Sequence, residues 1–352
     1  MDLPIIPFDP KIASREEWRR FHAYRRTRHL EADPDDPDFE DDTVERNLRR
    51  GHLQFDVTRL AVLDPAGADA QIGEVYVERS RPGTESHESN RHIAWVGAEL
   101  VRAHRGRGLA RRMLAEIVEI ARSHDRTILQ SWCEEDAGKA FAAAIGAKVV
   151  QRRRQNRLKF EDVDWSMVER WAMEGPRRAP GTALRWFVNR IDDDVLAPYC
   201  TLYTHVFNQQ PFGKAEHGEF VFTPEVFRER EARVADERST WITAITVEPN
   251  GDLSGLTEMT HVPDSKWIIF QQLTGVRDTY RGRGLGKWLK AEMLLRVRRE
   301  LPEMRVVTTG NASANVPMLS INERLGFRTH REPVVVEMTR DALESYLRDR
   351  GG

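Results

Sequence analysis

Cysteine is scarce in this sequence, since Cys133 and Cys200 are the only two among 352 residues. Their wide separation fits neither a disulfide framework nor a cysteine zinc site. The 11 histidines show no paired ligand spacing, so no metal site is predicted. Low cysteine use is typical of a reducing compartment, and we expect a cytoplasmic protein.

The sequence also lacks long apolar runs and a large net charge of either sign. No stretch approaches the roughly 20 apolar residues of a membrane span, and residues 1–7 lack the basic start of a signal peptide. The formal net charge of −2 gives no overall attraction to nucleic acid. We therefore expect neither a membrane nor a nucleic acid partner.

An internal repeat is the most informative feature that is present. The segment Arg105-Gly106-Arg107-Gly108-Leu109-Ala110 recurs as Arg281-Gly282-Arg283-Gly284-Leu285-Gly286, half the chain length further on. A chain of 352 residues is long enough for about two domains. Hydrophobic residues make up 40% of it, which is sufficient for two ordinary cores.

The sequence around the two copies follows the same order of elements. Each copy comes after an apolar, strand-like run and before an amphipathic helix, and a second strand and a short helix follow. The predicted strands are 94–101 and 127–132 in the first half and 267–276 and 305–309 in the second, and the short helices are 137–145 and 316–325. The sequence therefore predicts one αβ unit twice.

The boundary between the halves is placed near residue 176. Residues 164–174 have the pattern of a helix, and residues 175–181 are rich in glycine and proline, which end helices. We predict a first domain over 1–163, a linker helix and Pro/Gly linker over 164–181, and a second domain over 182–352.

The glycine turn between strand and helix predicts an anion site. The first N–H groups of a helix are unpaired, and glycines let the backbone close around a phosphate. Lys287 stands where a dinucleotide fingerprint needs its third glycine, and neither copy has the Gly-Lys-Ser/Thr of a phosphate loop. A turn that merely caps a helix or binds RNA phosphate is the alternative.

The pattern Arg-x-x-Gly-x-Ala/Gly in this setting resembles the acetyl-CoA signature of the GCN5-related N-acetyltransferases (GNATs). The resemblance covers both halves and implies an α/β (α+β) chain of two tandem GNAT folds. Each would have a mixed, mostly antiparallel central sheet flanked by helices. The tandem arrangement also resembles mycothiol synthase-like actinobacterial tandem acetyltransferases.

The resemblance implies acetyl-CoA or another acyl-CoA as cofactor. Its pyrophosphate would bind the N–H groups of the turn, and its pantetheine arm would add to the preceding strand. A backbone N–H of that strand would stabilise the oxyanion. The implied cofactor residues are Thr274, Gly275, Val276, Arg281, Gly282, Arg283, Gly284, Leu285, Gly286, Asn311 and Asn315 in the second half, and Leu100, Arg105, Gly106, Arg107, Gly108, Leu109 and Ala110 in the first.

Two residues are candidates for catalysis. In this family a strand carboxylate commonly acts as base, and Glu258 is a lone carboxylate in an apolar strand. A glutamate on the solvent face of that strand is an equally open interpretation. The usual family acid, a tyrosine, is replaced by Asn322, and by Ala142 in the first half. Asn311 and Asn315 are also open to an interpretation as caps or turn residues.

These features predict an acyl-CoA-dependent N-acyltransferase. The acceptor would be a primary amine of a small molecule in specialised or thiol metabolism, attacking directly in a ternary complex. We expect the second half to be catalytic and the first to be degenerate, in a monomer that is a pseudo-dimer or in a homodimer. The alternatives are a non-catalytic acetyl-CoA-binding regulatory module and a protein or peptide N-acetyltransferase.

Overall fold

The computed structural model describes residues 3–52, 54–67 and 70–349. The chain forms two compact units, each assembled from separate stretches of sequence. Unit 1 consists of Met1–Gln151, Lys214–Glu219 and Pro333–Gly352, and unit 2 consists of Arg152–Gly213 and Phe220–Glu332. Each unit is described by itself below.

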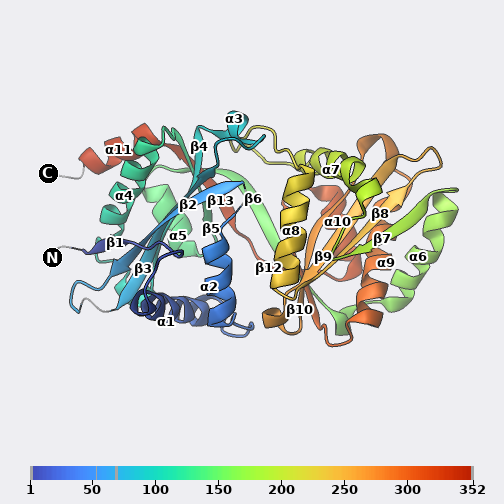
Figure 1. The fold of residues 1–352 in the computed structure, drawn as a ribbon, viewed down its shortest axis with the longest axis horizontal. Coiled ribbons are helices and arrows are strands. Elements are labelled where there is room, and N and C mark those ends of the chain that lie inside the picture. The colour runs from blue at the N-terminus through green and yellow to red at the C-terminus, as the bar shows by residue number, and fades with distance from the viewer. Residues whose placement is uncertain (1–2, 53, 68–69, 350–352) are drawn as a thin grey trace. The chain divides into compact units, whose positions relative to one another are not determined.

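Unit 1 is built on a mixed sheet with the strand order β1-β2-β3-β4-β5-β13, in which β4 and β5 run parallel and the other neighbours antiparallel. Alternation along β2 sends Leu60 and Val62 to the core beneath α4, and Ala61 and Leu63 to the core beneath α1 and α2. Its elements are β1 (Ile5–Pro7), α1 (Arg15–Ala32), α2 (Asp41–Arg50), β2 (Phe55–Leu63), β3 (Gln71–Ser80), α3 (His87–Asn90), β4 (Ile93–Leu100), α4 (Ala110–Ser123), β5 (Ile128–Cys133), α5 (Asp136–Ala144), β13 (Val334–Thr339) and α11 (Arg340–Asp349) (Figure 1).

Unit 2 repeats this plan with the strand order β6-β11-β10-β9-β8-β7, and here β10 and β11 are the parallel pair. Along β8, Ile242 and Ala244 face the core that α6 and α9 cover, while Trp241 and Ile245 face α7 and α8. Its elements are β6 (Lys148–Lys159), α6 (Trp165–Arg178), β7 (Ala183–Val188), α7 (Asp193–Asn208), α8 (Pro224–Asp236), β8 (Thr240–Val247), β9 (Leu253–His261), β10 (Ile268–Val276), α9 (Leu285–Glu300), β11 (Val306–Ala312), α10 (Val316–Leu325) and β12 (Arg328–Arg331) (Figure 1).

The last strands of the two repeats are exchanged. Strand β13 belongs to the second repeat in sequence, yet it pairs with β5 in unit 1, from Val334 opposite Cys133 to Thr339 opposite Ile128. Strand β6 follows the first repeat and pairs with β11 over residues 153–159. The sheet of each unit is therefore completed by a strand from the other repeat.

A short segment of the second repeat is also part of unit 1. Residues 214–219 follow α7, and the Gln130 side chain on β5 donates to the Glu216 carbonyl at 2.7 Å. The backbone N–H of Gly218 donates to Asn90 Oδ1 at 2.9 Å. The N–H of Glu216 donates to Glu337 on β13 at 2.8 Å. Side chains of unit 1 thus hold this stretch of backbone.

The predicted fold class is confirmed, and the predicted strands and short helices are present with ends shifted by a few residues. The end of the linker helix was predicted wrongly, because α6 continues through Gly175 and Pro176 to Arg178. The Trp288 ring packs onto Gly175, where a Cβ would approach it to 2.1 Å. Tertiary packing therefore outweighs the helix-breaking tendency of the pair. The division at residues 163 and 182 stays a prediction about the repeats.

Candidate functional site

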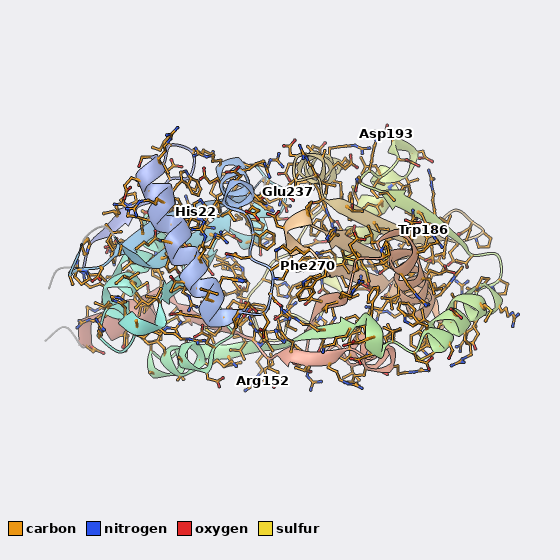
Figure 2. All side chains as sticks on the ribbon, turned by 90° about the horizontal axis from the view of Figure 1, so that it is seen from below. His22, Arg152, Trp186, Asp193, Glu237 and Phe270 are labelled. Atoms are coloured by element: carbon orange, nitrogen blue, oxygen red, sulfur yellow. The ribbon has the colours of Figure 1, made fainter. Side chains whose placement is uncertain are left out.

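The central feature of unit 2 is the point at which β10 and β11 part. Their parallel pairing runs from Ile268 opposite Val306 to Phe270 opposite Thr308, and Phe270 is labelled in Figure 2. Beyond it β11 continues alongside β6, and β10 continues alongside β9 with a bulge between Gln271 and Thr274. The far half of β10 thus has one edge that no strand of the described residues pairs with. An extended ligand that carries amides can pair with such an edge.

The glycine turn follows this edge directly. Gly282 and Gly284 both have φ near +83°, and Gly284 is the N-cap of α9. A Cβ on Gly282 would meet no atom within 4 Å, so the turn borders open space at this residue. The first N–H groups of a 16-residue helix therefore border an open, glycine-lined surface, which suits a phosphate.

The arginines of the turn have structural partners. Arg281 donates from Nε to the Val276 carbonyl at 3.3 Å and from Nη2 to Gln209 Oε1 at 2.6 Å. Arg283 donates to Glu248 and to Thr182, each at 2.8 Å. Both side chains hold the turn in place, so the groups left for an anion are mainly backbone N–H groups.

Four other predicted cofactor residues of unit 2 have side chains that are buried, hydrogen-bonded within the unit or reduced to a hydrogen. Leu285 is buried in a small core with Ala179 and Trp288, and Gly286 lies in the first turn of α9. A Cβ on Gly275 would lie 2.2 Å from Val206 Cγ1, so β10 approaches α7 closely at this residue. The Thr274 hydroxyl hydrogen-bonds that of Thr257 at 2.8 Å.

Glu258 lies on β9, is fully buried, and accepts hydrogen bonds from four side chains. Its Oε1 accepts from the Tyr199 hydroxyl, from Trp241 Nε1 at 3.0 Å and, at longer range, from Thr243 and Arg230. Its Oε2 accepts from Arg230 at 3.1 Å, the one partner of that oxygen among the described residues. Oε2 is therefore the atom of this carboxylate with a lone pair left to take a proton.

The groups around Glu258 keep their protons. Burial, and then the charge of Glu258, raises the pKa of Tyr199 well above its usual value. Burial works against the charge of Arg230, but the combined attraction of Glu258, Tyr203 and Tyr199 outweighs it and raises the pKa of Arg230. The arginine also lies 4.1 Å from the centre of the Trp241 ring. Tyr199 and Arg230 are thus fixed donors to one carboxylate.

Two of the three predicted asparagines lie together. Asn322 Nδ2 on α10 donates to Asn311 Oδ1 on β11 at 2.8 Å, whereas Asn315 caps α10 by accepting from the Met318 N–H at 3.4 Å. Asn322 is 1% exposed, and its Oδ1 has no hydrogen-bond partner among the described residues. A buried acceptor without a donor costs free energy, and a hydrogen-bond donor from a bound molecule would remove this cost.

Unit 1 contains the same glycine turn, but the strand before it differs from β10. Gly106 and Gly108 have φ of +75° and +78°, and α4 begins at Ala110. Strand β4, however, pairs with β3 without a register shift from Ala94 to Leu100. The bulge that distinguishes β10 is therefore missing from β4, which lies fully within the described residues.

The end of the unit 1 strands is also tied by ion pairs. Arg105 donates to the Leu100 carbonyl at 3.0 Å and pairs with Glu135 at the start of α5. Arg28 of α1 donates to the same carboxylate at 3.0 Å. The hydrogen bond from Arg105 is the main reason that the pKa of Glu135 falls to about 2. The resemblance to the GNAT signature predicted Arg105 beside a phosphate, but it did not indicate the ion pair with Glu135.

Sequence reasoning missed most of the buried network in unit 2. Tyr199 and Trp241 have the spacing of ordinary core residues, and Arg230 lies in a run of alternating charges on α8. The pairing of Thr243 opposite Glu258 across β8 and β9 brings the network together. A lone glutamate in an apolar strand was the signal available, since such a group needs buried donors.

Comparison with known proteins identifies the architecture. No family model and no curated protein sequence matches the chain. A tandem GNAT protein from the clavulanic acid biosynthesis pathway, solved without acetyl-CoA, aligns with a TM-score of 0.74 and 22% identity over 96% of this chain and 99% of its own. The chain has a tandem GNAT fold. A GCN5-related N-acetyltransferase from Sphaerobacter thermophilus aligns with a TM-score of 0.63 and 16% identity over 96% of both chains.

The GNAT fold implies an acyl-CoA cofactor, and the residues of unit 2 fit one. The bulged edge of β10 suits the amides of a pantetheine arm, and the open glycine turn suits a pyrophosphate. The unpartnered Asn322 oxygen is a buried acceptor on the helix that follows β11. In the described part of the chain no group of three His, Cys, Asp or Glu residues is placed to hold a metal ion. No described helix has the length and apolarity needed to cross a bilayer.

Proposed function

We propose that the protein is an acyl-CoA-dependent N-acyltransferase whose reaction takes place in unit 2. The observation that carries the proposal is the bulge in β10, where this strand leaves β11 and runs into the glycine turn of α9. Bound acyl-CoA supplies an activated acyl group as a thioester. A backbone N–H at the bulge would stabilise negative charge on the thioester oxygen, and the α9 turn would hold the pyrophosphate.

The acceptor is proposed to be a primary amine of a small molecule that attacks the thioester directly. Such an amine is mostly protonated at neutral pH, so it must lose a proton to react. We propose Glu258 as the base, acting through Oε2, while Tyr199 and Trp241 hold Oε1. Asn322 can donate a hydrogen bond to a sulfur but cannot supply a proton, so the leaving thiolate would take its proton from another group.

The first proposed test is cofactor binding by two matched glycine variants. Gly284→Val should abolish calorimetric binding of acetyl-CoA, because a β-branched residue at φ +83° strains the turn and covers its N–H groups. Gly108→Val introduces the same strain in unit 1 at φ +78° and should leave binding unchanged. Equal loss in both variants would mean that both units hold cofactor, and no saturable binding by the wild type would overturn the proposal.

The second test separates a base from a structural anchor at Glu258. Glu258→Gln should lower kcat/KM by about 10²–10⁴-fold across the pH range if the carboxylate takes the proton. Tyr199→Phe removes a donor but keeps the carboxylate, so its rate should fall far less. Both rates are measured beside the melting temperature of each variant. Similar rate losses that follow the loss of stability would assign Glu258 to a purely structural role.

The alternative is a non-catalytic acyl-CoA-binding module. Asn322 favours it, because the family usually has its acid, a tyrosine, at this position. Measuring the release of free CoA in the presence of a panel of small amines and peptides decides between an enzyme and a binding module. Turnover with a small amine supports the proposal, and turnover with peptides alone would indicate a protein or peptide N-acetyltransferase. The resemblance to mycothiol synthase-like enzymes stays a prediction about the domain arrangement and the shared motifs, and it does not fix the acceptor.

A further inference from the structure

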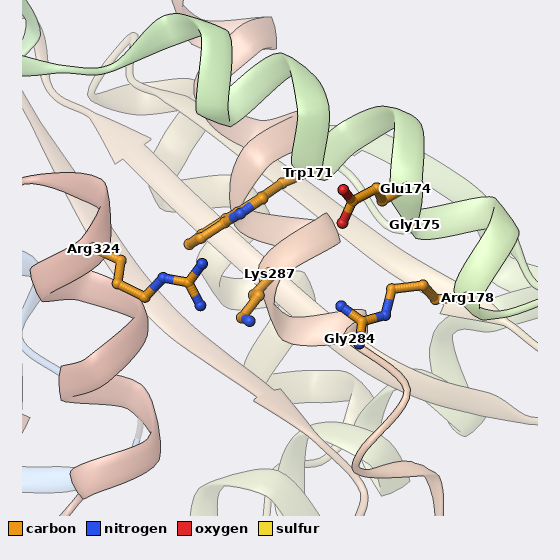
Figure 3. Close-up of a pocket in the computed structure, with 7 residues that line it drawn as sticks. All are labelled: Trp171, Glu174, Gly175, Arg178, Gly284, Lys287 and Arg324. Carbon is orange, nitrogen blue, oxygen red and sulfur yellow. The ribbon is translucent and has the colours of Figure 1, made fainter.

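A small cavity beside the glycine turn is lined by cations from three helices. It has a volume of about 60 Å³, room for a few water molecules or one group of phosphate size. Figure 3 shows the side chains converging on it from α6, α9 and α10. The lining residues are Trp171, Glu174, Gly175, Arg178, Gly284, Lys287 and Arg324.

Three cations and one carboxylate line this cavity. Arg178, Lys287 and Arg324 form no ion pair with a carboxylate among the described residues, although Glu174 also lines the cavity. The Trp171 ring supports two of them, with Lys287 Nζ 5.4 Å and Arg324 Cζ 4.9 Å from its centre. Burial, and then the charges of the two arginines, lowers the pKa of Lys287. Cations that repel one another in a shared cavity favour an anion between them.

The cavity adjoins the proposed cofactor site. A Cβ on Gly284 would lie 3.4 Å from Arg178 Cδ, so this arginine lies against the N-cap of α9. Lys287 is in the first turn of the same helix. An anion in the cavity would therefore be a near neighbour of a phosphate on the turn.

We propose that the cavity binds the 3′-phosphate of acyl-CoA, and that the linker helix α6 thereby supplies part of the cofactor site. The inference rests on the proposed function. A phosphomonoester carries close to two negative charges at neutral pH, and guanidinium and ammonium groups are its usual partners. Helix α6 lies outside both repeated αβ patterns, so Trp171 and Arg178 are contributions of the linker. Their role would make the linker a functional element as well as a connection.

The test compares acetyl-CoA with 3′-dephospho-acetyl-CoA by calorimetry. The full-length wild type should bind acetyl-CoA about 10- to 100-fold more tightly, the effect of one or two charged hydrogen bonds. The double variant Arg178→Met, Arg324→Met should lose this preference by weakening acetyl-CoA binding alone. Arg177→Met is the matched control, because Arg177 is also exposed on α6 and does not line the cavity.

The outcomes separate this inference from the proposed function. Equal wild-type affinity for the two ligands would overturn the inference and leave acyl-CoA binding intact. A double variant that weakens both ligands to the same extent would also overturn it, since the arginines would then act on the turn as a whole. If neither ligand binds the wild type, the proposed function itself fails.

Discussion

The Lys290→Met variant is expected to be more stable than the wild type by about 4 kcal/mol at pH 7. Lys290 is 2% exposed on α9, and its ammonium has one polar partner among the described residues, Gln271 Oε1 at 3.4 Å. The Phe327 ring lies 5.2 Å away. Burial lowers the pKa of Lys290 from 10.5 to about 7, so the folded state holds this proton far less tightly than the unfolded chain does.

The sign of the pH dependence follows from that difference. Between pH 7 and pH 10.5 the unfolded state binds more protons than the folded state, so wild-type stability should rise with pH. Methionine has no proton to release, and the advantage of the variant should shrink over the same range. Thermal unfolding at several pH values measures this, with the exposed Lys159→Met as control. An advantage that stays constant with pH would contradict the assignment of the effect to Lys290.

Deletion of residues 333–352 is expected to unfold unit 1, although most of this unit lies in the first half of the sequence. The deletion removes β13, which pairs with β5 over six residues, and α11, whose Leu343 is buried in the core beneath α4. Limited proteolysis with mass spectrometry should show new cleavage throughout residues 3–151. Unit 2 contains none of the deleted residues, so its fragments should persist longer.

Two point variants refine this prediction. Leu343→Asp places a charge in the same core and should destabilise unit 1 by several kcal/mol, on the order of a lost core side chain. Asp341→Ala alters an exposed side chain two residues earlier on the same helix and should be close to neutral. A truncated protein whose residues 3–151 resist protease as the wild type does would show that unit 1 is stable without its last strand.

The sequence predicted the repeated elements because their signals are local. The two glycine turns, the apolar strands before them and the helices after them are all visible over short stretches, and the structure has them in that order. The course of α6 through Gly175 was predicted wrongly because it depends on Trp288, which is distant in the sequence. Local propensity carries no information about such a partner.

The candidate site was predicted only in its backbone parts. Motif and spacing indicated the turn and the strand edge, whereas the donors to Glu258 come from α7, α8 and β8. Their convergence depends on strand register and helix packing, which a single sequence does not reveal. The same holds for the exchange of β6 and β13, because the edges of β5 and β11 offer the same backbone groups to any strand.

That exchange has a consequence for the inheritance of the gene. A recombination between the two repeats would give β5 of one parent the β13 of the other, and β11 the β6 of the other. Each new sheet would then contain a strand whose side chains were selected against a different neighbour. The repeats are therefore unsuited to shuffling as separate modules, and substitutions in each half are constrained by a strand that the other half encodes.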